Sequence, residues 1–277
     1  MDLRADLHLH TTASDGRWTP RELIAEVQRA GIDIFAVTDH DSLDNLAETI
    51  ELVRGSGLYF LPGVELSVRL NGQLYHLLAY GFDLADPDLN ALVRANNALL
   101  GEGNEEAIRL LIQAGYPISL DDYATYTWDR SRGGWKAINF LIDSGICRDV
   151  RGYFGELFGG DLAHPEPCFP PLQEAIDVVR RAGGVVLLAH PGVPYYNGPD
   201  ERRLDAMVEM GIQGLECFAP SHDRDSTRRF IDYCWSHDLL ITGGSDCHGG
   251  FAGRALGVPP VYASDLRLGI LKGMTIA

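Results

Sequence analysis

Short apolar runs alternate with helical patterns along most of this chain, and a histidine or an acidic residue follows most of the runs. The β-branched run at 32–37, for example, leads to His40, and the run at 185–189 stops at His190. Such alternation implies parallel strands joined by right-handed crossovers, and about seven of these units favour a closed barrel over an open sheet. The sequence therefore predicts an α/β barrel.

Helix and turn signals support this prediction. Thr19 is typical of a helix N-cap, Pro20 of the first helical position and Gly31 of a helix end. Asn71-Gly72 lies between two alternating runs, which is a strong hairpin signal. We therefore expect a hairpin over residues 66–80, inside the otherwise parallel pattern.

The alternation stops in the middle of the chain. Residues 88–171 contain helical patterns at 89–114 and 135–142 with irregular sequence between them. We expect this segment to be a mostly helical insertion that caps the active site. Residues 1–87 and 172–277 would then form the barrel.

Composition limits the possible functions. The chain has 277 residues, 45% of them hydrophobic, which suffices for one barrel-sized domain. Its formal net charge of −16 argues against duplex DNA as a partner, because duplex binding needs a basic face. The five cysteines lack a C-x-x-C spacing, and no apolar run reaches about 18 residues. We expect a cytoplasmic protein without a disulfide framework or a membrane span.

Histidines and acids gather where strands are expected to end. His8 and His10 are two residues apart, so a strand would place both on one face. In α/β barrels the chemistry lies at the carboxyl ends of the strands, and histidine is the commonest metal ligand. The residues at such positions are His8, His10, His40, Glu65, His190, Asp246 and His248. Their pattern predicts a metal centre.

These motifs together resemble the PHP (polymerase and histidinol phosphatase) family, which implies a distorted (βα)7 barrel with the helical insertion described above. The resemblance rests on Asp6-Leu7-His8-Leu9-His10, Ser14-Asp15-Gly16, Thr38-Asp39-His40, Gly63-Val64-Glu65, His76, Ala189-His190-Pro191 and Gly243-Gly244-Ser245-Asp246-Cys247-His248.

The resemblance implies two to three divalent metal ions. The first site would use His8, His10, Glu65 and Asp246; the second Glu65, His76 and His190; the third Asp15, His40 and His248. Some members of the family have a histidine where this chain has Asp15. A carboxylate there makes the third site harder, so manganese and iron are expected beside zinc.

Metal charge then indicates the reaction. Three divalent ions would exceed the charge of three ligand carboxylates and leave a pocket suited to a phosphate dianion. Clustered metals can also lower the pKa of a water molecule and orient the resulting hydroxide for in-line attack. We expect a phosphoesterase that acts on a small phosphomonoester. The resemblance points to a nucleotide, either a nucleoside 5′-monophosphate or a 3′,5′-bisphosphate.

Other residues are candidates for binding substrate or moving protons. His222 and Asp246 are the expected catalytic residues. His222 could protonate the leaving group or bind phosphate, although a loop-capping role explains it equally well. Asp39 and Asp41 could orient His40 or cap the following helix. The basic candidates for holding a phosphate are Arg130, Arg132 and Lys136 in the insertion, with Arg17 and Arg254 as weaker ones.

Three alternatives remain open at this stage. A 5′-to-3′ exoribonuclease acting on short single-stranded RNA would use aromatic side chains for base stacking, and Tyr123, Tyr126, Trp128 and Trp135 could supply them. A histidinol phosphatase is favoured less, because the Asp15 carboxylate and the short insertion suit the nucleotide branch better. A non-catalytic, metal-stabilised module would be inert to phosphoesters.

Overall fold

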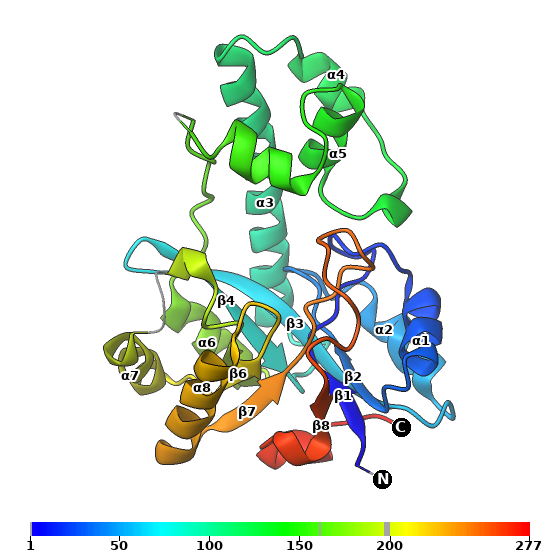
Figure 1. The fold of residues 1–277 in the computed structure, drawn as a ribbon, viewed down its shortest axis with the longest axis vertical. Helices are drawn as coiled ribbons and strands as arrows, with labels where there is room; N and C mark the ends of the chain where they lie inside the picture. The colour runs from blue at the N-terminus through cyan, green and yellow to red at the C-terminus, as the bar shows by residue number, and fades with distance from the viewer. Residues whose placement is uncertain (1, 161, 197–199) are drawn as a thin grey trace.

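A computed structural model describes residues 2–160, 162–196 and 200–277 of the protein (Figure 1). Its centre is one eight-stranded sheet in the order β7-β6-β5-β4-β3-β2-β1-β8. The strands are β1 (Arg4–Asp6), β2 (Ile34–Val37), β3 (Tyr59–Leu70), β4 (Gln73–Tyr80), β5 (Val185–Leu188), β6 (Gly214–Phe218), β7 (Leu240–Gly243) and β8 (Val261–Tyr262).

The sheet curves into a nearly closed barrel. The segments that follow β1 and β7 meet: the Leu7 N–H donates to the Gly243 carbonyl at 3.0 Å, and Leu9 forms a parallel bridge with Cys247. The predicted distorted α/β barrel is confirmed. Strand β8, which pairs antiparallel with β1, was not expected from the sequence.

The predicted hairpin is the source of the distortion. Asn71 and Gly72 both have positive φ, 52° and 82°, as a tight turn between antiparallel strands requires. Strand β4 therefore runs antiparallel to both of its neighbours, β3 and β5. Strands β2 and β3 pair in parallel, and so do β5 and β6. Strand β3 has 12 residues, and Glu65 lies in the part of it that pairs with β4.

Five helices cover the outside of the barrel: α1 (Pro20–Arg29), α2 (Leu46–Val53), α6 (Leu172–Arg181), α7 (Glu201–Met210) and α8 (Arg224–Ser236). Helix α1 begins with the predicted cap, in which Thr19 and Glu22 form a reciprocal capping box. A separate apolar cluster fills the barrel, where Leu7, Leu61 and Leu187 meet Leu271 from the C-terminal segment. Short helical turns lie at η3 (Pro194–Tyr196), η4 (Ala263–Asp265) and η5 (Gly269–Gly273).

The middle of the chain is largely helical, and its α4 and α5 lie above the barrel in Figure 1. It contains α3 (Pro87–Gln113), α4 (Leu120–Thr125), η1 (Arg130–Arg132), α5 (Lys136–Asp143) and a π-helical turn, η2 (Gly152–Leu157). Leu89 and Leu92 of α3 join the barrel core, whereas Ala107 and Leu111 join a third apolar cluster made with α5 and η2. Helix α3 thus belongs to both parts, and the division at residue 88 remains a prediction. No helix within the described residues is long and apolar enough to cross a membrane.

Candidate metal centre

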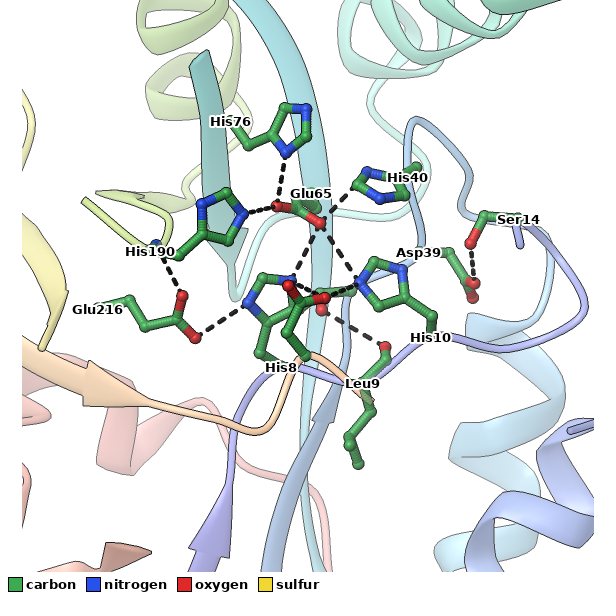
Figure 2. A network of polar contacts seen from close by, with 12 residues as sticks. His8, Leu9, His10, Ser14, Asp39, His40, Glu65, His76, His190 and Glu216 are labelled. Carbon is green, nitrogen blue, oxygen red and sulfur yellow. Dashed lines mark hydrogen bonds and ion pairs between the residues drawn. The ribbon is translucent and has the colours of Figure 1, made fainter. Parts of the chain in front are cut away.

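Glu65 stands at the centre of a ring of histidines. It lies on β3 and is completely buried. Figure 2 shows imidazoles from several strand ends converging on its carboxylate. Five ring nitrogens lie within 2.9 to 3.3 Å of its two oxygens, and they come from His8, His10, His40, His76 and His190.

Two further carboxylates complete this centre. Asp246 Oδ1 lies 3.1 Å from His10 Nε2, and Asp15 Oδ2 lies 3.2 Å from His248 Nε2. His10 connects them, because its other ring nitrogen, Nδ1, lies 3.7 Å from Asp15 Oδ1. The predicted ligands therefore converge in space from the ends of β1, β2, β5 and β7 and from the paired strands β3 and β4.

Three sets of potential ligand atoms are compact enough to hold a cation. They are His8, His10, Glu65 and Asp246; His10, Asp15, His40 and His248; and His40, Glu65 and His76. The first equals the first predicted site, and the second contains the third predicted site. His190 joins through Glu65, at 2.9 Å. The assignment of individual residues to individual ions remains a prediction.

The chemistry of this donor set fits divalent metal ions. Buried carboxylates need positive charge or hydrogen-bond donors nearby, and here mostly imidazoles face them. His10 Nδ1 is buried and has no hydrogen-bond partner among the described residues. Several buried nitrogen and carboxylate ligands at these spacings are what a multinuclear metal site requires.

The pKa values of these groups in the metal-free centre also fit a site for metal ions. Burial lowers the pKa of His40 to about 3. Burial also opposes a charge on His10, but the carboxylates of Asp246 and Glu65 raise its pKa to about 10. Although burial raises the pKa of Asp15, the imidazoles of His248, His40 and His10 together outweigh it and hold that pKa well below its usual range. Without a cation, the centre therefore keeps protons on some of its imidazoles, which a bound metal ion would displace.

Buried aspartates hold the loops that present these residues. Asp39 accepts hydrogen bonds from the Thr11 N–H at 2.7 Å and the Ser14 hydroxyl at 2.6 Å. Asp41 accepts from the Ser67 hydroxyl at 2.6 Å and the Asn96 amide at 2.7 Å. The expectation that these acids orient His40 or cap the next helix is wrong. Asp39 fixes the loop before Asp15, and Asp41 ties α3 to β3 beside Glu65.

One buried carboxylate was missed by the sequence analysis. Glu216 lies in β6 and is fully buried. Its Oε1 lies 2.9 Å from His8 Nδ1, and its Oε2 accepts the His190 N–H at 2.7 Å. The available signal was an acidic residue within the apolar run 214–218, since a charge in a buried strand needs a partner.

Comparison with known proteins decides the family. Residues 6–117 match the PHP domain. A 3',5'-nucleoside bisphosphate phosphatase from Chromobacterium violaceum is 31% identical to this chain over 92% of the chain and 93% of that protein. The chain belongs to the PHP family. The resemblance inferred from the strand-end motifs is confirmed.

Two other proteins are similar to this chain over nearly their whole length. A 5'-3' exoribonuclease from Haemophilus influenzae is 27% identical over 90% of this chain and 91% of that protein. A solved structure from Bifidobacterium adolescentis, described as a metal-dependent phosphoesterase, has a TM-score of 0.81 and 28% identity over 92% of this chain and 91% of that one. The present protein is thus a PHP metal-dependent phosphoesterase, and the predicted enzyme class is confirmed.

The insertion reaches the PHP metal centre through residues 130–135. Arg130 donates to the Thr12 carbonyl at 3.0 Å, and the Gly134 N–H donates to the Asp15 carbonyl at 2.7 Å. The ring of Trp135 lies 6.3 Å, centroid to centroid, from that of His40. The insertion therefore borders the centre on its Asp15 side.

The other basic candidates differ in how they are held. Arg17 Nε donates to the Ser131 carbonyl at 2.9 Å, so this exposed side chain stays beside the insertion. Arg132 pairs through both terminal nitrogens with Asp143, and Lys136 donates to the Ala124 carbonyl at 3.1 Å. Arg254 forms an ion pair with Asp246 at the metal centre itself.

His222 lies in a loop after β6, beside the segment that follows His190. Its Nδ1 lies 2.9 Å from the Cys217 carbonyl, and its Nε2 accepts the Gly192 N–H at 2.9 Å. Burial lowers the pKa of its imidazole. Both nitrogens are thus in use, one with β6 and one with the segment after His190, and His222 could donate a proton only by giving up one of these bonds. Its catalytic role remains a prediction.

Proposed function

We propose that this PHP enzyme hydrolyses a small phosphomonoester and that its substrate is a nucleotide, either a nucleoside 5′-monophosphate or a 3′,5′-bisphosphate. The observation that carries the proposal is the contact of residues 130–135 with the rim of the metal centre. Arg130 and the indole ring of Trp135 lie on the side of the metal centre that contains Asp15 and His40. A guanidinium suits a second phosphate, and an indole suits a base or a ribose.

The proposed ligands are the nine residues predicted from the family resemblance: His8, His10, Asp15, His40, Glu65, His76, His190, Asp246 and His248. Two to three divalent ions of manganese, iron or zinc would activate water and offset phosphate charge there. The position of Glu65, which faces the imidazoles of His8 and His190, supports this set of ligands. Arg254, paired with Asp246, is well placed to contact a phosphate oxygen next to the ligands.

Arg17 and Arg130 are the proposed contacts for a second phosphate. Both are exposed and bond mainly to backbone carbonyls, so a phosphate can become an additional partner. Arg132 and Lys136 would have to exchange their present contacts with Asp143 and Ala124 to join them. We therefore rank Arg17 and Arg130 above the other two.

A 5′-to-3′ exoribonuclease on short RNA is the second candidate, because the relative from Haemophilus influenzae carries that name. The aromatic groove expected for RNA is smaller than the sequence indicated. Tyr123 is buried against Phe140, and the Tyr126 hydroxyl donates to Asp143 at 2.6 Å. Trp128 and Trp135 remain for stacking, which favours a short ligand over a long strand.

The test is phosphate release by manganese-loaded protein across nucleoside monophosphates, 3′,5′-bisphosphates, histidinol phosphate and a short 5′-phosphorylated RNA. Metal content is determined on the same sample. We expect fast turnover of one small nucleotide. Shortening of the RNA alone would replace this proposal with the exoribonuclease, and turnover of histidinol phosphate alone would replace it with histidinol phosphatase.

A further inference from the structure

Glu216 is a buried acid whose two oxygens are both occupied by groups that belong to candidate metal ligands. It comes from β6, which contributes none of the proposed ligands. Its neighbours Leu215 and Cys217 are buried apolar residues of the core. Glu216 belongs to none of the compact ligand sets. The acid therefore lies beside His8 and His190, at the edge of the metal centre and outside the compact ligand sets (Figure 2).

The contact with His8 determines which ring nitrogen of that residue is free. An ionised carboxylate can only accept, so the 2.9 Å contact with Glu216 Oε1 places the proton on His8 Nδ1. His8 Nε2, which lies 3.0 Å from Glu65 Oε2, is then the ring nitrogen left to bind a metal ion. A carboxylate behind a ligating histidine fixes its ring and raises its basicity.

The contact with His190 acts on the backbone. His190 has a φ of 28°, which is unusual for a residue other than glycine. Its N–H donates to Glu216 Oε2 at 2.7 Å, and the conformation presents Nε2 to Glu65 Oε1 at 2.9 Å. One carboxylate thus holds two candidate ligands that are 182 positions apart in the chain, from His8 to His190.

We propose that Glu216 is a positioning residue of the metal centre, which orients His8 through its ring and His190 through its backbone. The proposal rests on the ligand assignment under Proposed function. Loss of the carboxylate removes both contacts at once, the one to His8 and the one to the His190 N–H. Thr242 is the matched control: it is the register partner of Glu216 on β7, is buried, and its hydroxyl has no hydrogen-bond partner among the described residues.

The experiment measures zinc affinity of the full chain by chelator competition for wild type, Glu216→Gln, Glu216→Ala, His8→Ala and Thr242→Val. Glutamine keeps the size of the side chain but only one acceptor oxygen. We expect zinc affinity to fall about 10-fold for Glu216→Gln and up to about 100-fold for Glu216→Ala, the usual range for such partners. Thr242→Val should retain wild-type affinity.

A second readout follows the ring of His8 without any assay of turnover. In zinc-loaded protein with 15N-labelled histidine, the protected Nδ1–H signal that disappears in His8→Ala should persist in Glu216→Gln and be lost in Glu216→Ala. Thermal unfolding of the metal-free variants checks that each one folds.

The outcomes separate this proposal from the ligand assignment. If His8→Ala weakens zinc binding while a folded Glu216→Gln and Glu216→Ala both bind like wild type, the role of Glu216 is overturned. Equal weakening by Thr242→Val would overturn it too, because general packing would then be the cause. If His8→Ala binds zinc as tightly as wild type, the ligand assignment fails, and this proposal fails with it.

Discussion

The two sides of the metal centre are built in different ways. On one side, Glu65 and His76 lie on paired strands, in a ladder that runs from Gly63–Tyr80 to Leu70–Gln73. On the other side, Asp15 and His248 lie in loops after the ends of β1 and β7. Those loops bind each other, since the Arg17 N–H donates to the His248 carbonyl at 3.2 Å, and the Asp15 loop also accepts the Gly134 N–H from the insertion.

This difference determines which ligands can move when a residue is substituted. Ligands on the strands cannot move without breaking sheet hydrogen bonds, so they form the fixed part of the site. Ligands on the loops depend on contacts that the insertion supplies. We therefore expect changes on the Glu65 side to abolish most of the turnover. Changes on the Asp15 side should have smaller effects on turnover and KM.

The largest effect should come from Glu65→Gln. The substitution removes the charge that five imidazoles face and should lower phosphate release by more than about 100-fold, because even partners one step behind a metal ligand cost about 10- to 100-fold. Phosphate release and bound metal should fall together. Glu22→Gln is the control, since its exposed capping box tolerates glutamine. Retained activity in Glu65→Gln would remove the distinction between the two sides.

Asp15→Asn should have a smaller effect. It removes a carboxylate only from the set with His10, His40 and His248. We expect bound metal to fall by one ion per chain and turnover to fall about 10-fold, the low end for a perturbed metal site. Metal analysis after gel filtration checks this. Loss of all metal would mean that the loop side is as essential as the strand side.

Gly134→Ala tests the contact between insertion and loop. Gly134 has a φ of 73°, and an added Cβ would lie 2.5 Å from the ring of Phe251. The segment should shift away from Asp15 and raise KM several-fold, well below the roughly 100-fold cost that a displacement of 1 Å at the reacting groups can have. Steady-state kinetics on the substrate found above would measure it.

Gly101→Ala is the matched control for that variant. Gly101 lies in α3, and nothing lies within 4 Å of an added Cβ. Because alanine favours a helix more than glycine does, this variant should gain about 0.5–1 kcal/mol in free energy of unfolding. Its KM should stay unchanged. An equal rise in KM for both variants would contradict a specific role for the Gly134 contact.

The smallest expected effect concerns pH and involves His10, which belongs to both sides. In metal-free protein its pKa is raised to about 10 by the carboxylates of Asp246 and Glu65, against the opposing effect of burial. A raised pKa stabilises the fold fully below pH 6.5, and that stabilisation is lost as the pH rises toward 10. The metal-free protein should therefore lose several degrees in Tm between pH 7 and pH 9.5.

The loaded protein is the comparison for this measurement. A bound metal ion replaces the proton and binds more tightly as the pH rises. The gap in Tm between loaded and metal-free protein should widen with pH. A constant gap would show that His10 does not exchange a proton for metal.

The sequence predicted those features in which a particular residue type occurs at the start or end of a periodic apolar pattern. Thr19 caps its helix, Asn71-Gly72 turns the hairpin, and the strand ends deliver Glu65 and His190 to one place. These features depend on local backbone preferences or on strand ends meeting at one edge of a barrel. Both can be inferred from residue order alone.

The missed features depend on contacts between distant segments. Glu216 has no spacing relation to His8 and meets it only because the barrel brings β6 and the end of β1 together. The Gly134 contact uses backbone atoms, which have no side-chain signature. Asp39 and Asp41 were assigned to the wrong partners, because neighbours in sequence suggested His40 while the fold offered Thr11 and Ser67.

Helix α3 has a consequence for how such an enzyme diverges. Its first turns are part of the barrel core, and its last turns are part of the upper cluster, so one continuous rod carries the insertion. Asn96, in the first half of the rod, donates to Asp41 and to the carbonyl of Ser67, which lies on the same strand as Glu65. Substitutions beyond that anchor can change the rim on the Asp15 side, while Glu65 and His76 stay held by their paired strands.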